Sequence, residues 1–206
     1  MAVKPSVVIL CEGKSDEEIL KVLFKKERLY HINPLLQPLD GVTEFKERNI
    51  RSRVCSSLKR PGVLAVFALI DLKGSRVDYP PNITSYTNRA KFLKEHLKKF
   101  LSGLPESDRF YPHVAVHDIE AWILADKDAV AKYLKTSTIA YKADVPESID
   151  FNRPPSYILK DLFRDKELVY RKTVHGPDLF RTVNIDIVYN KCPHFKDFID
   201  DLLKVT

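Results

Sequence analysis

Short apolar runs alternate with amphipathic segments along the chain, a pattern typical of α/β proteins. The runs 6–10 and 63–70 are almost wholly apolar, as expected of strands that are covered on both faces of a parallel sheet. The segment 33–39 carries two prolines and is expected as a weak edge strand. Alternating apolar positions in 110–116 indicate a fourth strand.

Helical spacing of apolar residues is found between these strands and after them. Ser15 with Glu18 matches a capping box, which predicts a helix directly behind the first strand. The segments 43–58 and 86–101 are predicted as helices, each with several lysine or arginine side chains. The apolar positions within 195–203 follow the same spacing and predict a final helix that packs on the core.

This alternation predicts an α/β fold with a mainly parallel central sheet flanked by helices. A length of 206 residues fits a single domain, since about 150 residues is an ordinary domain size. We expect residues 1–116 to form the core of this domain. Residues 117–206 are expected to form a helical C-terminal extension packed on that core.

Composition and charge exclude several classes of protein. An apolar fraction of 44% and a charged fraction of 30% exclude collagen-like and wholly disordered chains. The longest apolar run, 63–70, is far shorter than the ~20 residues that cross a bilayer, so no membrane segment is expected. The net charge of +6 gives only a small preference for polyanionic partners. Scattered cysteines and the lack of a signal-peptide pattern predict a cytoplasmic protein with reduced thiols.

Three carboxylates are expected to meet at one edge of the predicted sheet. Glu12 follows the first strand, Asp71 follows the strand 63–70, and Asp16 lies in the first helical turn, four residues after Glu12. Ligands of open α/β sheets bind at the carboxyl ends of the strands. Carboxylate oxygens suit Mg²⁺ or Mn²⁺, so a divalent cation site is predicted here. Alternatively, Asp16 is only a favourable charge at a helix N-terminus and Asp71 only caps a strand end.

The residues Gly13-Lys14-Ser15 imitate the end of a phosphate-binding P-loop. The full motif requires a glycine five residues before that Gly, and Val8 stands there. The loop is also too short to wrap a phosphate. An ATPase with this motif is therefore excluded.

Two further segments carry candidate residues. His117 and Glu120 are three residues apart, and on a helix this spacing places both on one face, where they can hold a metal. Alternatively, Glu120 only complements the dipole at a helix N-terminus. Lys172 and His175 lie in a basic segment that is expected as a loop and that can bind phosphate oxygens or support a charged transition state. Alternatively, this segment is a solvated basic loop without a role in function.

Together these residues resemble a Toprim domain, the metal-binding α/β module of topoisomerases, primases and overcoming-lysogenization-defect nucleases. More narrowly, the chain is similar to the Toprim-like family catalogued as domain of unknown function 4276. The resemblance covers nearly the whole chain. It is carried by residues 8–16, 111–122, 152–156 and 192–193 with the helix that follows.

The resemblance implies roles for individual residues. Glu12 matches the glutamate that acts as general acid/base or metal ligand, and Asp71 matches the first aspartate of an Asp-x-Asp pair that holds Mg²⁺. The second aspartate is missing, because Lys73 stands at its position and reduces the negative charge available to a cation. This departure puts two-metal chemistry in doubt. Glu120 can replace the missing ligand if its helix folds over the sheet edge.

Three functions are compatible with these residues. The first is a metal-dependent phosphodiesterase acting on nucleic acid, for example in defence against foreign DNA. Mg²⁺ or Mn²⁺ would be held by Glu12, Asp71 and Glu120, with Asp16 nearby. The basic helices at 43–60 and 84–101 would grip the nucleic-acid backbone. The second is a non-catalytic or regulatory partner of an ATPase, which the resemblance to the family implies. The third is a nucleotide-binding or phosphotransfer enzyme that acts on small substrates.

Overall fold

A four-stranded parallel sheet forms the centre of the computed structural model, which describes residues 3–39, 41, 45–73, 75, 77–139, 144–149 and 152–206. The strand order is β2-β1-β3-β4, and all neighbouring strands are parallel. The bounds are β1 Ser6–Cys11, β2 Pro34–Pro38, β3 Val63–Asp71 and β4 Phe110–Ala115. The predicted α/β fold with a mainly parallel sheet is thus confirmed.

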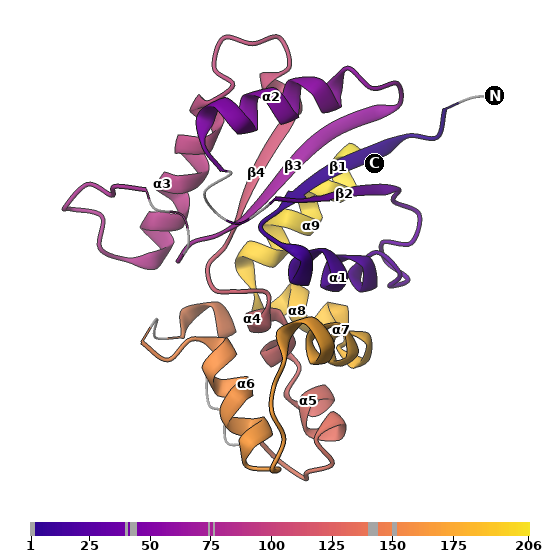
Figure 1. Cartoon of the computed structure of the whole chain (residues 1–206), viewed down its shortest axis with the longest axis vertical. Helices are drawn as coiled ribbons and strands as arrows, with labels where there is room; N and C mark the ends of the chain where they lie inside the picture. The colour runs from indigo at the N-terminus through magenta and orange to yellow at the C-terminus, as the bar shows by residue number, and fades with distance from the viewer. Residues whose placement is uncertain are drawn as a thin grey trace.

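Helices connect the strands and fill the second half of the chain (Figure 1). The three helices that follow the first three strands are α1 Lys14–Leu23, α2 Glu47–Leu58 and α3 Tyr86–Lys99. After β4 the chain is helical: α4 Glu120–Ala125, α5 Lys127–Tyr133, α6 Pro155–Arg164, α7 Lys172–Thr182, α8 Ile185–Lys191 and α9 Pro193–Val205. Figure 1 shows α4 to α8 gathered below the sheet.

The two faces of the sheet belong to two separate apolar clusters. Successive side chains of a strand point to opposite faces, so Phe67 and Leu69 lie on one face while Val66 and Ala68 lie on the other. The Phe67 face packs against α1 and the helices from α4 to α9. The Val66 face packs against α2 and α3. This parity places any side chain at position 71 on the same face as Phe67.

The final helix packs as predicted against the Phe67 face. Phe195 and Phe198 of α9 are fully buried, and the ring of Phe195 meets Trp122 of α4 edge-on with centroids 4.7 Å apart. Phe198 contacts Phe67 of β3 in the same manner at 6.0 Å. Aromatic pairs in this arrangement add about 0.5–1.5 kcal/mol beyond their buried area. They connect the sheet, α4 and α9 in one core.

Two prolines reduce the number of hydrogen-bond donors on the outer edge of β2. Val7 donates its N–H to Asn33 and Leu39 donates its N–H to Cys11, which fixes the direction of every backbone group in β2. Because directions alternate along a strand, Pro34, Leu36 and Pro38 face away from β1. Proline has no N–H, so Leu36 offers the one outward donor of this strand. The predicted edge strand is confirmed.

Three helices begin at other residues than the sequence pattern indicates. α1 begins at Lys14, so Gly13 takes the capping position and the Ser15–Glu18 capping box is not formed. α4 begins only at Glu120, so His117 precedes the helix and the expected shared helical face does not exist. α7 begins at Lys172, so the segment expected as a loop is helical from that residue on.

The basic helix predicted over 43–58 begins at Glu47 in the structure. Its expected first residues, Thr43 and Glu44, lie outside the described residues. The prediction of 86–101 as a helix agrees with α3 to within two residues. Both helices cover the Val66 face of the sheet.

A buried carboxylate caps the N-terminus of α9. Glu147 accepts the backbone N–H of His194 at 2.9 Å and of Phe195 at 3.3 Å, which satisfies two of the unpaired donors that open this helix. Burial raises the pKa of Glu147 to about 7. Ionised Glu147 at this helix terminus therefore costs desolvation free energy.

We predict that this carboxyl group makes the protein less stable as the pH rises. The folded protein binds the Glu147 proton more tightly than the unfolded chain, where the pKa is near 4.5. The stabilisation is complete below about pH 4.5 and is lost as the pH passes about 7, a change of about 3 kcal/mol. Urea unfolding at several pH values measures it.

The matched variant is Glu147→Gln, which has no proton to exchange at this position. The difference in unfolding free energy between wild type and variant is expected to change steadily across this pH range. Parallel pH profiles for the two proteins would show that Glu147 keeps an ordinary pKa.

Candidate functional site

Glu12 and Asp71 lie side by side at the carboxyl edge of the sheet. β1 pairs with β3 so that Cys11 is opposite Leu69, which brings Glu12 level with the residue before Asp71. The backbone N–H of Asp71 donates a hydrogen bond to the side-chain carboxyl group of Glu12, which joins the two strand ends. The sequence-based expectation that these residues meet at one edge therefore holds in the structure.

Asp16 joins this pair from the first turn of α1. Its Oδ2 atom accepts the backbone N–H of Gly13 at 3.2 Å, which fixes the turn between β1 and α1. Its Oδ1 atom lies 3.2 Å from the ammonium nitrogen of Lys172. Only 5% of Asp16 is exposed. Asp16 thus caps its own helix with one oxygen and binds a cation with the other.

Glu120 reaches the same place from α4. The residue is 1% exposed, and its Oε2 atom lies 3.3 Å from the Lys172 ammonium. Its Oε1 atom accepts the hydroxyl of the buried Tyr170 at 3.4 Å. The neighbouring Trp122 anchors α4 in the core and so positions this carboxylate. The expected fold of α4 toward the carboxyl edge is observed.

Lys172 is the cation of this cluster and the first residue of α7. Its side chain is 27% exposed. Burial alone would lower the pKa of this ammonium group, but the surrounding carboxylates outweigh burial and raise the pKa above its usual range. The carboxylates that contribute are Glu120, Asp16, Asp71 and Asp118. Lys172 therefore stays charged and ties α7 to α1 and α4.

Negative charge is in excess around the Lys172 ammonium. Burial is the main cause of a raised pKa at Glu12, Asp71 and Glu120, and neighbouring carboxylates raise each of them further. Asp71 retains some exposure as a residue, while its carboxyl group is buried deeply enough for burial to dominate. Raised carboxyl pKa values in a cluster indicate groups poised for proton transfer or for binding a cation.

Asp118 is a further member of this cluster, and it lies just before α4. Its carboxylate raises the pKa of Glu12, Asp71 and Glu120. It follows β4, whose last residue Ala115 is paired with Asp71. The rule that selected Glu12 and Asp71, an acidic residue just beyond a strand end, would have found it too.

The two candidate histidines face other partners. The Nε2 atom of His117 donates to the carbonyl of Ile149 at 2.8 Å, and burial lowers the pKa of this ring. The Nδ1 atom of His175 accepts the backbone N–H of Arg171 at 2.8 Å. The His175 ring also packs on Phe163 with centroids 4.8 Å apart. His175 thus braces the first turn of α7, the turn that carries Lys172.

The donor set suits a hard divalent cation. Apart from His117, the candidate ligands are carboxylate oxygens, and the Oε2 atom of Glu12 has no hydrogen-bond partner among the described residues. Within the same residues, no three Asp, Glu, His or Cys side chains are grouped as ligands of one ion. The Lys172 ammonium takes the position between Asp16 and Glu120. The residues fit Mg²⁺ or Mn²⁺ by chemistry, once their side chains close on the ion in place of the ammonium.

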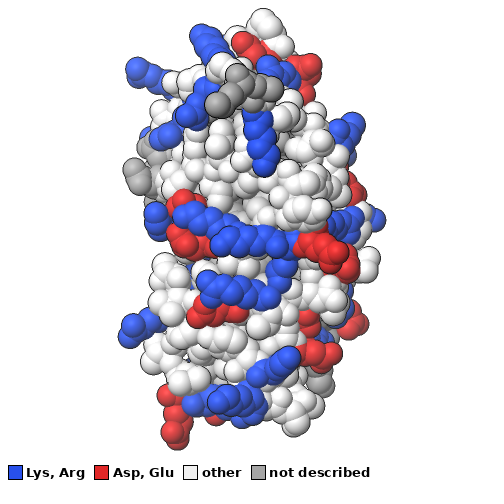
Figure 2. Space-filling view, turned by 90° about the vertical axis from the view of Figure 1, so that its right-hand side faces the viewer, with Lys and Arg blue, Asp and Glu red and all other residues white. Residues whose placement is uncertain are grey.

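The basic helices lie on the opposite face of the sheet from these carboxylates. α2 and α3 pack on the Val66 face, while α1, α4 and α7 pack on the Phe67 face. The expected grip on nucleic acid by these two helices therefore has no direct path across one face to the site. Figure 2 shows the right-hand side of the view in Figure 1, where positive and negative side chains lie next to one another in a band across the middle.

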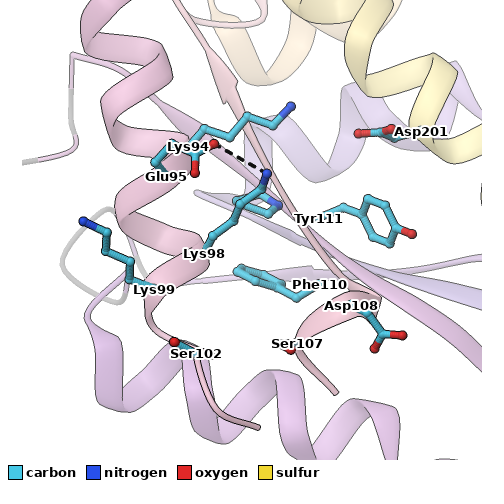
Figure 3. A pocket seen from close by; sticks show the side chains of 11 residues that line it. Lys94, Glu95, Lys98, Lys99, Ser102, Ser107, Asp108, Phe110, Tyr111 and Asp201 are labelled. Carbon is cyan, nitrogen blue, oxygen red and sulfur yellow. Dashed lines mark ion pairs between the residues drawn. The ribbon is translucent and has the colours of Figure 1, made fainter. Parts of the chain in front are cut away.

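A cavity of about 540 Å³ lies at the other end of β4, between its first residues and the C-terminal half of α3 (Figure 3). Three lysines line it, and Lys98 pairs with Glu95 at 3.5 Å. The carboxylates of Glu95, Asp108 and Asp201 balance the lysine charges in number. This cavity is therefore electrically balanced and separate from the carboxylate cluster.

In the described part of the chain, each helix is too short or too polar to cross a membrane.

Removing the central cation is expected to destabilise the fold. Lys172→Met keeps most of the side-chain volume and leaves Asp16 and Glu120 buried without a partner charge. We expect a loss of about 3–5 kcal/mol in unfolding free energy near pH 8. A smaller loss is expected at acidic pH, because burial raises the pKa of Glu120 and uptake of a proton removes its unpaired charge. Urea unfolding at both pH values measures the two losses.

Lys21→Met is the matched control, because this exposed lysine pairs with Glu17 at 2.8 Å on the surface of α1. Surface ion pairs contribute little, so its unfolding curve should stay close to that of wild type. An equally small effect in Lys172→Met would show that the buried ion pairs do not tie the three helices together.

Comparison with known proteins gives one match. The family model of a domain of unknown function, DUF4276, matches residues 11–203. No curated protein and no solved structure matches the chain. The matched range runs from the end of β1 to the end of α9 and includes every residue of the carboxylate cluster. This chain is therefore a member of the DUF4276 family.

Proposed function

We propose that the protein is a metal-dependent phosphodiesterase that acts on nucleic acid, with Mg²⁺ or Mn²⁺ as its cofactor. One observation supports this function above all. Carboxyl groups from the ends of three strands and from two helices converge around a single ammonium at the edge where α/β proteins bind ligands. Such an excess of buried negative charge calls for a further cation.

Glu12, Asp16 and Asp71 are the proposed ligands, and Glu120 completes the set in place of the missing second aspartate. A divalent cation there would polarise a phosphate oxygen and make a water molecule more acidic. The raised pKa and unpartnered Oε2 atom of Glu12 suit it to accept a proton from that water.

Lys172 and His175 would support this chemistry. Lys172 can offset charge that develops on the phosphate, since its side chain retains some exposure. His175 acts in this proposal through α7, because its hydrogen bond to the Arg171 N–H holds the turn that carries Lys172. His117 is a weaker candidate for a metal ligand, since its Nε2 atom donates a hydrogen bond to a carbonyl group.

A substrate would approach along the carboxyl edge and not across the basic helices. The three helices α1, α2 and α3 each follow a strand of the parallel sheet and therefore begin at this edge. Helix N-termini carry partial positive charge and free N–H groups that favour phosphate. This is the route by which phosphodiesters can reach a site that is rich in carboxylates.

A non-catalytic role beside an ATPase is the second candidate. It is favoured by one observation, that Lys172 already pairs with the carboxylates that would hold the ion. Lys73 at the position of the second aspartate adds to this case. In that role the ion pairs of the cluster would only hold the helices together, and removal of the Glu12 carboxyl group would leave function unchanged.

We predict cleavage of plasmid or single-stranded DNA that requires Mn²⁺ or Mg²⁺ and that is lost on chelation. Glu12→Gln keeps the side-chain shape and removes the proton acceptor, so the rate should fall at least about 100-fold. Binding should also weaken steeply with salt, because phosphate contacts release counterions. Cleavage rates and salt titrations of the purified protein measure both.

Glu27→Gln is the matched control, since Glu27 is exposed and lies outside the cluster. It should cleave at the wild-type rate. Metal-dependent cleavage that persists in Glu12→Gln would contradict the assignment of Glu12. Saturable Mn²⁺ binding with no cleavage of any nucleic acid would favour the non-catalytic role.

A further inference from the structure

The Lys172 ammonium is bound in a way that suits exchange. It lies 3.2 Å from Oδ1 of Asp16 and 3.3 Å from Oε2 of Glu120. Both distances are longer than the about 2.7–2.9 Å of a strong charge-assisted hydrogen bond. Contacts of this length are weaker than short, well-aligned ones, so another cation can replace the ammonium at a smaller loss.

The position of Lys172 in its helix is also unfavourable for a cation. It is the first residue of α7, and the N-terminus of a helix carries partial positive charge that repels an ammonium group. The carboxylates overcome this repulsion while the pair is intact. Once another cation neutralises Asp16 and Glu120, the helix terminus favours movement of the ammonium toward solvent.

A path for that movement exists. The Lys172 side chain is 27% exposed, whereas the two carboxylates that it pairs are almost fully buried. The lysine side chain rotates about four single bonds, so the ammonium can swing outward while α7 stays in place. Asp16 and Glu120 cannot follow, because Gly13 and Tyr170 hold their other oxygens.

We propose that Lys172 is an internal cation that occupies the carboxylate site until a divalent metal ion displaces its ammonium group. This inference rests on the proposed metal site. Displacement leaves Asp16 and Glu120 to the incoming ion and turns the ammonium toward the entrance. There it can meet a phosphate oxygen, so that metal binding and the readiness of Lys172 for an anionic substrate are coupled.

Calorimetric titration of Mn²⁺ into three proteins tests the exchange: wild type, Lys172→Met and Lys21→Met. Removal of the competing ammonium should tighten Mn²⁺ binding about tenfold in Lys172→Met, or about 1.4 kcal/mol. Lys21→Met removes a surface lysine that pairs with Glu17 and should bind Mn²⁺ as wild type does. The measurement requires no catalytic activity.

The outcomes separate the exchange from the metal site itself. Saturable Mn²⁺ binding that is equal or weaker in Lys172→Met would overturn the exchange and leave the metal site standing. Absence of binding in all three proteins would overturn both. Tighter binding in Lys172→Met alone supports both.

A second measurement uses the wild-type protein alone and so does not depend on the folding of a variant. An amine-acylating reagent labels lysines at rates that follow their accessibility, and mass spectrometry reports each site. Mn²⁺ should speed the labelling of Lys172 several-fold relative to Lys21. An unchanged ratio at Mn²⁺ concentrations that saturate the calorimetric signal would overturn the exchange.

Discussion

The ion pairs of Lys172 are the interaction on which the arrangement around the sheet edge depends. α1, α4 and α7 are distant in sequence, and each contributes one charged side chain to the same point. Two carboxylates that are nearly excluded from water need a positive partner, or they must take up protons. The contact therefore fixes the orientation of three helices and gathers their charged side chains at one edge of the sheet.

The pattern of hydrophobic residues along the chain predicts much of the architecture. Unbroken apolar runs predict β1 and β3 because strands buried on both faces cannot carry polar side chains. The positions of Glu12 and Asp71 then follow, since the carboxyl ends of parallel strands share an edge. The prediction that these two residues lie close together does not depend on how the helices pack on the sheet.

The starts of α1, α4 and α7 could not be predicted, because contacts that the local sequence pattern does not show set them. Gly176 and Pro177 are poor helix formers, so the local propensity for a helix around Lys172 is weak. In the fold, Gly176 lies against α1, where an added Cβ would be 3.0 Å from Ile19. The close approach of these two helices outweighs the weak propensity. It also brings Lys172 to Asp16, a contact that no local pattern reveals.

The proline pair in β2 has a consequence for how the protein behaves at high concentration. An open strand edge can recruit a strand of another molecule, and this is a common first step toward fibres and swapped dimers. With one outward donor between two prolines, β2 cannot form the continuous ladder that such growth needs. Any association of this protein with itself or with a partner is thereby directed away from this edge, to its helices or to the far side of the sheet.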